Sequence, residues 1–216
     1  VTAVEPSTKH PASAPIGTID FPVMGRGGLP DRFVRVHVDT CPARKDKLPG
    51  RKLVTAVALE AIRAALSAAR MLLGNAQHFT VTLQDVGAPI DEESLGFAVA
   101  MAAISAGLGW SLPECICLTG QVMESGALLP VQGIERKRRL LAVERPLAKL
   151  LGPEDVPTLA RAMSQVFAIN VARGREQYRS LVRALVCNTG LSRLLVAGLG
   201  NGQAESLEDV YVDPDL

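Results

Sequence analysis

Hydrophobic residues recur along this chain with two spacings, and segments of one kind alternate with segments of the other. Apolar residues at every second position predict strands, here at residues 16–24, 33–38 and 78–83. Apolar residues at every third and fourth position predict helices, and the clearest helix covers residues 53–73, with Gly74 and Asn75 as its expected end. A second helix, built from small uncharged residues, is predicted at residues 94–106.

The second half of the chain continues the alternation with shorter segments. Strands are predicted at residues 115–118, 148–151 and 166–169, with a hairpin that returns through residues 127–131. Helices are predicted at residues 133–144, from Pro153 onward, and at residues 175–187. This order of strands and helices predicts a mixed fold of the α+β or α/β class, in one domain over residues 16–188.

The two ends of the chain have a different composition. Residues 1–15 contain three prolines and show no hydrophobic periodicity, which predicts a flexible leader. They also lack the apolar stretch of a secretory signal. Residues 189–216 are rich in glycine and then acidic, which predicts a linker or tail.

The charge balance narrows the classes of function. With 23 Lys and Arg against 22 Asp and Glu, the net charge is +1, so overall charge gives no basis for binding nucleic acid or an anionic membrane. The uncharged run from Ser94 to Pro113 is long enough to cross a bilayer, but its many small residues favour a buried helix. Four cysteines are too few for a disulfide scaffold and match no zinc motif, so we expect a cytoplasmic protein with reduced thiols.

One lysine stands at a position where the helical pattern predicts an apolar residue. In the helix at residues 133–144, Ile134 and Leu141 define an apolar stripe, and Lys137 falls between them on the same stripe. One interpretation is that the stem of Lys137 lies along the apolar surface while its amine reaches solvent. The other is a buried amine whose pKa is lowered by desolvation, so that it can act as a base near neutral pH.

A serine precedes the uncharged helix and also has two interpretations. Ser94 follows the acidic residues Asp91, Glu92 and Glu93, so it could be an ordinary N-cap. Alternatively it is a nucleophile at a helix N-terminus, where free N–H groups favour an oxyanion. A serine needs a base, and a neutral lysine can supply one.

Three short motifs in this region resemble the proteolytic domain of Lon proteases. Residues 89–96 (PIDEESLG) resemble the family's nucleophile loop P-K-D-G-P-S-A-G. Residues 118–121 (LTGQ) and 129–137 (LPVQGIERK) resemble its M-T-G-E and L-P-I-G-G-L-K-E-K motifs. The serine of the first motif falls on Ser94 and the last lysine on Lys137, 43 residues apart as in the family, with no gap.

This resemblance implies a Lon-like fold, with small mixed sheets and packed helices, over residues 16–188. It further implies a serine endopeptidase that uses a Ser/Lys dyad and cleaves protein or peptide substrates without a metal or organic cofactor. Ser94 would be the nucleophile and Lys137 the base, Thr119 would orient the lysine, and Asp91 matches an aspartate of the nucleophile loop. Backbone N–H groups around Ser94 would hold the oxyanion. Lon domains form hexameric rings, so the resemblance also implies a homo-oligomer.

The sequence departs from the family pattern around the nucleophile. Gly-Pro before the serine is replaced by Glu92 and Glu93, which places two carboxylates close to where a substrate must pass. The residue after the serine is Leu95 rather than a small one. Glu135 replaces the first lysine of the third motif, and Gln121 replaces the glutamate after Thr-Gly. Both dyad residues, Ser94 and Lys137, and the orienting residue Thr119 are kept.

Two further features leave alternatives open. The chain carries no P-loop motif, whereas Lon proteases carry their own ATPase module. Residues 206–214 resemble the segment before a NACHT-type nucleotide-binding module of bacterial signalling and defence proteins, which would make the chain the effector part of a larger switch; the alternative is an acidic tail. For the domain itself, the alternatives are a catalytically inactive scaffold or oligomerisation module of the same fold, and nucleic-acid binding through Arg136, Lys137, Arg138 and Arg139.

Overall fold

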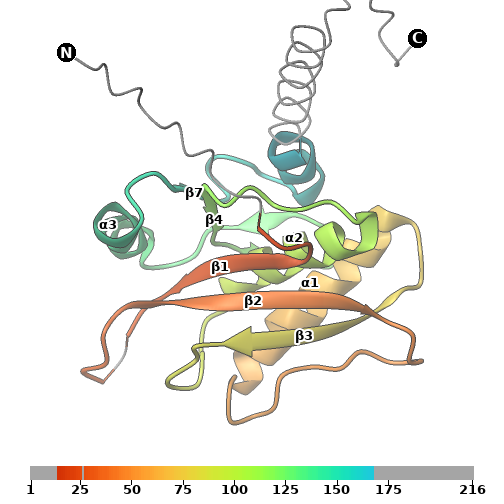
Figure 1. Cartoon of the computed structure of the whole chain (residues 1–216), viewed down its shortest axis with the longest axis horizontal. Coiled ribbons are helices and arrows are strands. Elements are labelled where there is room, and N and C mark those ends of the chain that lie inside the picture. The colour runs from red at the N-terminus through yellow and green to blue at the C-terminus, as the bar shows by residue number, and fades with distance from the viewer. Residues whose placement is uncertain (1–13, 26, 168–216) are drawn as a thin grey trace, which may run out of the picture. The chain divides into compact units, whose positions relative to one another are not determined.

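A three-stranded antiparallel sheet forms one layer of the fold (Figure 1). The structure is a computed structural model that describes residues 14–25 and 27–167. Strands β1 (Thr18–Val23), β2 (Arg32–Cys41) and β3 (His78–Gln84) pair in the order β1-β2-β3. Along β2, Val34, Val36 and Val38 are fully buried, because alternate residues of a strand face the same side of the sheet. The three strands predicted here are confirmed.

Helices α1 (Ala56–Leu73) and α2 (Leu95–Leu108) lie side by side on one face of this sheet (Figure 1). The Thr55 hydroxyl accepts a hydrogen bond from the Ala58 N–H at the start of α1, and Gly74, in a left-handed conformation, ends the helix as predicted. Helix α2 is buried on every side from Leu95 to Ser105, since it contacts α1 as well as β1 and β2. Its uncharged sequence therefore belongs to a core helix. Within the described ranges, no helix has both the length and the apolar character required to cross a membrane.

The remaining elements form two small sheets and a third helix. Strands β4 (Ile116–Leu118) and β7 (Lys149–Leu151) pair in parallel, and helix α3 (Ile134–Glu144) lies between them in the chain. Strands β5 (Gln121–Val122) and β6 (Leu128–Leu129) form the predicted hairpin. Mixed small sheets packed with helices fit the α+β class, because the three-stranded sheet is antiparallel throughout.

The region after β7 corrects the sequence prediction. The helix expected from Pro153 is a turn there, and helical structure begins only at Leu159. The strand predicted at residues 166–169 is wrong at Val166 and Phe167, which continue this helix, and residues 168 and 169 lie outside the described ranges. Leu159, Ala162, Val166 and Phe167 are all buried, at the spacing of a helix face. Residues 166–169 form a short run that is wholly apolar, so its spacing alone does not distinguish a strand from a helix.

Several predicted segments lie outside the described residues. These are the leader as far as residue 13, the helix at residues 175–187 and the tail at residues 189–216.

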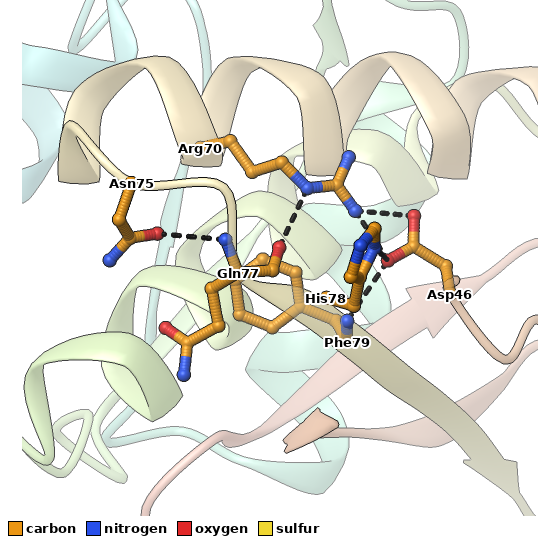
Figure 2. A network of polar contacts seen from close by, with 6 residues as sticks. All are labelled: Asp46, Arg70, Asn75, Gln77, His78 and Phe79. Carbon is orange, nitrogen blue, oxygen red and sulfur yellow. Dashed lines mark hydrogen bonds and ion pairs between the residues drawn. The ribbon is translucent and has the colours of Figure 1, made fainter. Parts of the chain in front are cut away.

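A cluster of polar groups, which we call the arginine cluster, joins the loop before α1 to α1 and β3 (Figure 2). The guanidinium of Arg70 on α1 binds both carboxylate oxygens of Asp46 and donates to the Gln77 carbonyl at 2.7 Å. Asp46 also accepts the Phe79 N–H at 2.9 Å, and its Oδ1 lies 3.5 Å from Nδ1 of His78. The cluster thus fastens a loop that has no regular structure of its own to two elements of the core.

Candidate active site

Four polar side chains from different parts of the chain meet around the amine of Lys137. We call Lys137, Ser94, Thr119 and Glu92 the lysine cluster. Nζ of Lys137 lies 2.7 Å from Oγ of Ser94, 3.1 Å from Oγ1 of Thr119 and 2.6 Å from Oε2 of Glu92. The structure therefore brings together the three residues that the Lon resemblance selected and adds a fourth, Glu92.

Helix α3 turns Lys137 inward, as the apolar stripe predicted. Lys137 and Leu141 are the two buried residues of this helix, four positions apart. The whole Lys137 residue is only 1% exposed, so its amine does not reach solvent and the snorkelling interpretation is wrong. Glu135 and Arg138, on another face, pair with each other at 2.5 Å.

Ser94 directly precedes α2 but does not act as its cap. Its backbone has an α conformation and its side chain makes no capping hydrogen bond, so the N-cap interpretation is wrong. The hydroxyl instead accepts a hydrogen bond from Lys137 and donates one to Oε2 of Glu92 at 2.8 Å. Ser94 is 3% exposed, and its side chain is thus committed to the lysine cluster.

Backbone hydrogen bonds hold Thr119 next to Ser94. The Thr119 N–H donates to the Leu151 carbonyl at 3.0 Å, which extends the β4–β7 pairing by one residue. The following N–H, of Gly120, donates to the Ser94 carbonyl at 3.1 Å. A Cβ at Gly120 would lie 3.2 Å from Cγ of Pro153, so this close approach favours glycine. The fully buried Thr119 hydroxyl is thereby fixed within reach of Lys137.

The backbone donors expected to form an oxyanion hole are already occupied. The N–H groups of Leu95 and Gly96 donate to the carbonyls of Glu92 and Glu93, at 3.4 and 3.0 Å. The next N–H, of Phe97, donates to the Gly120 carbonyl at 3.0 Å. The turn that carries Glu92 therefore uses donors that a reacting carbonyl would need.

Asp91, the fourth residue taken from the resemblance, points to another element. Its Oδ1 accepts a hydrogen bond from the hydroxyl of Thr55 at 2.7 Å, and Thr55 is the N-cap of α1. The backbone supports the same connection, because the Thr55 N–H donates to the Ile90 carbonyl at 2.9 Å. This geometry assigns Asp91 a role in attaching the nucleophile loop to α1.

Glu92 is the functional residue that sequence reasoning did not select. Its Oε2 binds Lys137 and Ser94, while its Oε1 accepts the Met24 N–H at 2.8 Å. The signal in the sequence was a carboxylate two positions before the nucleophile, where the family has glycine. It indicated a charge near the substrate path, but residue spacing cannot show that the side chain turns back onto the dyad.

The environment of Lys137 acts on its amine in two opposite ways. Burial disfavours the charged form and lowers the pKa of Lys137 below its ordinary value of 10.5. The charge of Glu92 and its hydrogen bond oppose this effect without cancelling it. The Phe21 ring of β1 lies 4.6 Å from Nζ and also favours the cation. Lys137 thus loses its proton more readily than an exposed lysine, although its neighbours favour the protonated state.

A separate cavity of about 510 Å³ lies away from these groups. Three of its four charged lining residues are paired with one another, because Asp20 binds Arg35 at 3.0 Å and Arg145 at 2.6 Å. No member of the lysine cluster lines this cavity. The chemistry that the described residues offer is therefore concentrated at the lysine cluster.

Comparison with protein-family models gives no match to this chain, and comparison with curated proteins gives none either. Within residues 14–25 and 27–167, no group of three or more His, Cys, Asp or Glu side chains is placed to hold a metal ion. The geometry of the lysine cluster and the motif resemblance therefore carry the functional argument.

Proposed function

We propose that this chain contains a Lon-like serine endopeptidase domain that uses Ser94 as nucleophile and Lys137 as general base. The observation that carries the proposal is the 2.7 Å contact between Oγ of Ser94 and a lysine amine that is 1% exposed. A hydroxyl becomes a nucleophile only beside a base, and a desolvated lysine is such a base. The mixed sheets and packed helices support a Lon-like fold.

The proposed reaction is acyl transfer in two steps. Neutral Lys137 accepts the proton of Ser94 Oγ as this oxygen bonds to the peptide carbonyl carbon and the π electrons move onto the carbonyl oxygen. The C–N bond then breaks, and the lysine ammonium returns the proton to the leaving amine. Water hydrolyses the resulting ester with Lys137 again as base, and Thr119 orients the amine through its 3.1 Å contact.

The motif resemblance also leads to proposals about partners, and these rest on the resemblance alone. An NTPase module after residue 216 would deliver or gate the substrate, and assembly into a ring would enclose it. Bacterial signalling or defence would be the setting of such a switch protein.

One observation favours the alternative of an inactive module with the same fold. The lysine cluster is buried and Glu92 occupies both dyad groups, so no substrate carbonyl can reach Ser94 in this geometry. In a domain without activity, no substrate would compete with Glu92 for Ser94 and Lys137, so this contact would persist. The complete Ser94, Lys137 and Thr119 set favours the enzyme.

Cleavage of an unfolded protein, followed by mass spectrometry from about pH 6 to about pH 10, tests the proposal. We expect weak wild-type cleavage, from molecules in which the contacts of Glu92 have opened, at cut sites that vanish in Ser94→Ala and in Lys137→Met, both checked for folding by circular dichroism. Ser125→Ala is the matched control, because Ser125 is exposed in the turn between β5 and β6. Cut sites that persist in Ser94→Ala would contradict the proposal.

A further inference from the structure

Glu92 binds both groups of the proposed dyad through a single oxygen. Its Oε2 lies 2.6 Å from Nζ of Lys137 and 2.8 Å from Oγ of Ser94. Its other oxygen accepts the Met24 N–H, so the carboxylate is held from two sides. At 11% exposure, the Glu92 side chain is more exposed than that of Lys137, and Ser94 and Thr119 are buried residues.

The hydrogen bonds correspond to a dyad that cannot react. An ammonium has three donors, and Glu92, Ser94 and Thr119 supply one acceptor for each. With all three protons in place, Lys137 has no lone pair to take a proton. The hydroxyl proton of Ser94 points to Glu92 rather than to the lysine. Both catalytic groups are thus in the wrong state for the first step.

The backbone of the same turn blocks a third requirement of the reaction. The carbonyls of Glu92 and Glu93 accept the N–H groups of Leu95 and Gly96, the two backbone donors that follow Ser94 in the chain. An oxyanion needs such donors unoccupied and aimed at it. Unwinding this one turn would free the backbone donors and remove Glu92 from the dyad together.

A second layer of contacts holds the turn closed. Met24 belongs to the connection between β1 and β2, and the next N–H, of Gly25, donates to Asp31 at 2.8 Å. Arg136, the neighbour of Lys137 on α3, donates to Asp31 at 2.7 Å and to the Gly25 carbonyl at 3.2 Å. Helix α3 therefore carries Lys137 and, through Arg136, also contacts the backbone segment whose Met24 N–H binds Glu92.

We propose that Glu92 is a built-in inhibitory latch, which keeps the Ser94–Lys137 dyad inactive until the turn before α2 opens. This inference rests on the proposed peptidase function and adds its regulation. In the open state Lys137 loses the proton that the carboxylate stabilises, Ser94 turns its proton to the amine, and the N–H groups of α2 become available to the oxyanion.

The neighbouring charges are engaged elsewhere, which isolates the effect of Glu92. In the same loop, Asp91 binds Thr55 and the Glu93 side chain is exposed. On β1, Asp20 binds Arg35 and Arg145. The charges of α3 next to Lys137 are also paired: Arg136 with Asp31, and Glu135 with Arg138.

The first test measures the protonation of Lys137 and needs no activity. In protein with ¹³C-labelled lysine, the ¹³Cε shift of Lys137, assigned with Lys137→Met, is titrated in wild type, Glu92→Gln and Glu93→Gln. Loss of the carboxylate removes the contact that favours the cation, so we expect the Lys137 pKa to fall by about one unit in Glu92→Gln, which is about tenfold more neutral amine. Glu93→Gln, the matched control, should leave it unchanged. An equal or higher pKa in Glu92→Gln would overturn the latch.

The second test measures the reactivity of Ser94 with a fluorophosphonate, read by intact mass and peptide mapping. We expect labelling about tenfold faster in Glu92→Gln than in wild type, and at least as fast in Glu92→Ala, which also removes the cover over the site. Circular dichroism checks that both variants fold. Labelling that is lost in both variants but present in wild type would make Glu92 the base and overturn the latch. A lowered Lys137 pKa without any labelling of Ser94 would instead overturn the peptidase.

Discussion

Two of the ionic clusters in the described part of the chain use the same kind of contact in different surroundings. In the arginine cluster, Arg70 binds Asp46 and the Gln77 carbonyl, and Asp46 accepts the Phe79 N–H of β3 (Figure 2). In the lysine cluster, Lys137 binds a carboxylate and two hydroxyls, and one hydroxyl belongs to a serine at the start of a helix. Arginine stays charged at any relevant pH, whereas a buried lysine can lose its proton. The cation that can lose its proton is the one that contacts the nucleophile.

Burial separates the clusters further. The side chains of Arg70 and Asp46 are 24% and 20% exposed, so water can still solvate part of each charge. Lys137 is 1% exposed, and Glu92 compensates its charge. A site that only fastened a loop would gain little from such desolvation, because a buried ion pair is rarely worth more than apolar packing. The free-energy cost of burying Lys137 is explained if the site needs a lysine of lowered pKa.

The strongest test of this comparison replaces the cation in each cluster. Lys137→Met should reduce peptide cleavage by about 10²- to 10⁴-fold through loss of the general base. Arg70→Met should leave cleavage per folded molecule unchanged but lower the free energy of unfolding by about 2 kcal/mol, through lost hydrogen bonds to charged groups. Cleavage assays and urea titrations measure the two effects. Equal losses of cleavage in both variants would remove the distinction.

A smaller effect is expected at Thr119. Thr119→Val keeps the shape and removes the acceptor for Lys137, so kcat should fall about tenfold, equivalent to one hydrogen bond of about 1.4 kcal/mol. Thr119→Ser restores the hydroxyl and should recover most of the rate. If the valine variant were as fast as wild type, Thr119 would be a packing residue only.

The pH dependence of stability should have the same sign in both clusters but fall in different pH ranges. The pKa of Lys137 is lowered by burial, so cleavage should rise with pH through a value below 10.5, and stability should also rise between that value and 10.5, where the unfolded chain binds more protons. Burial of Asp46 tends to raise its pKa, but the bonds from Arg70 and Phe79 lower it below 3.8 overall. The stability that Asp46 supplies is therefore present above pH 3.8 and lost as the pH falls through the lowered value. Acid unfolding of wild type and Asp46→Asn, together with a pH–rate profile, checks both.

The smallest effect concerns Asp91. Asp91→Asn keeps an acceptor for the Thr55 hydroxyl, so we expect a loss of at most about 1 kcal/mol in unfolding free energy and little change in cleavage. Thermal unfolding and a cleavage assay measure these. A loss of cleavage as large as that of Ser94→Ala would return Asp91 to the catalytic machinery.

The sequence predicted much of this arrangement because its signals are local. Residue spacing located Lys137 on the buried face of α3, and alternation located all three strands of the antiparallel sheet. The strand predicted at residues 166–169 failed because Val166 and Phe167 fit either period over so short a stretch. A longer window, including Leu159 and Ala162, shows the helix.

The hydrogen bonding of the lysine cluster could not be predicted from the sequence, because it depends on the conformation of the Glu92 side chain. The sequence of the loop shows that Glu92 stands near Ser94. Whether the Glu92 side chain faces solvent or the dyad depends on its contact with the Met24 N–H, which comes from a connection 68 residues earlier. The occupied N–H groups of Leu95 and Gly96 likewise depend on the turn geometry. The first feature is tertiary and the second is a local backbone conformation, whereas the motif and its spacing lie within the sequence itself.

The most direct measurement of the central claim compares the peptide products of Glu92→Gln with those of Glu92→Gln combined with Ser94→Ala. Both proteins are incubated with the same unfolded substrate, and the cut sites are identified by mass spectrometry. The account predicts a set of cut sites in the single variant that exceeds wild type in amount and is absent from the double variant. Identical products from both proteins, or no cut sites from a folded Glu92→Gln, would contradict a Ser94–Lys137 peptidase held inactive by Glu92.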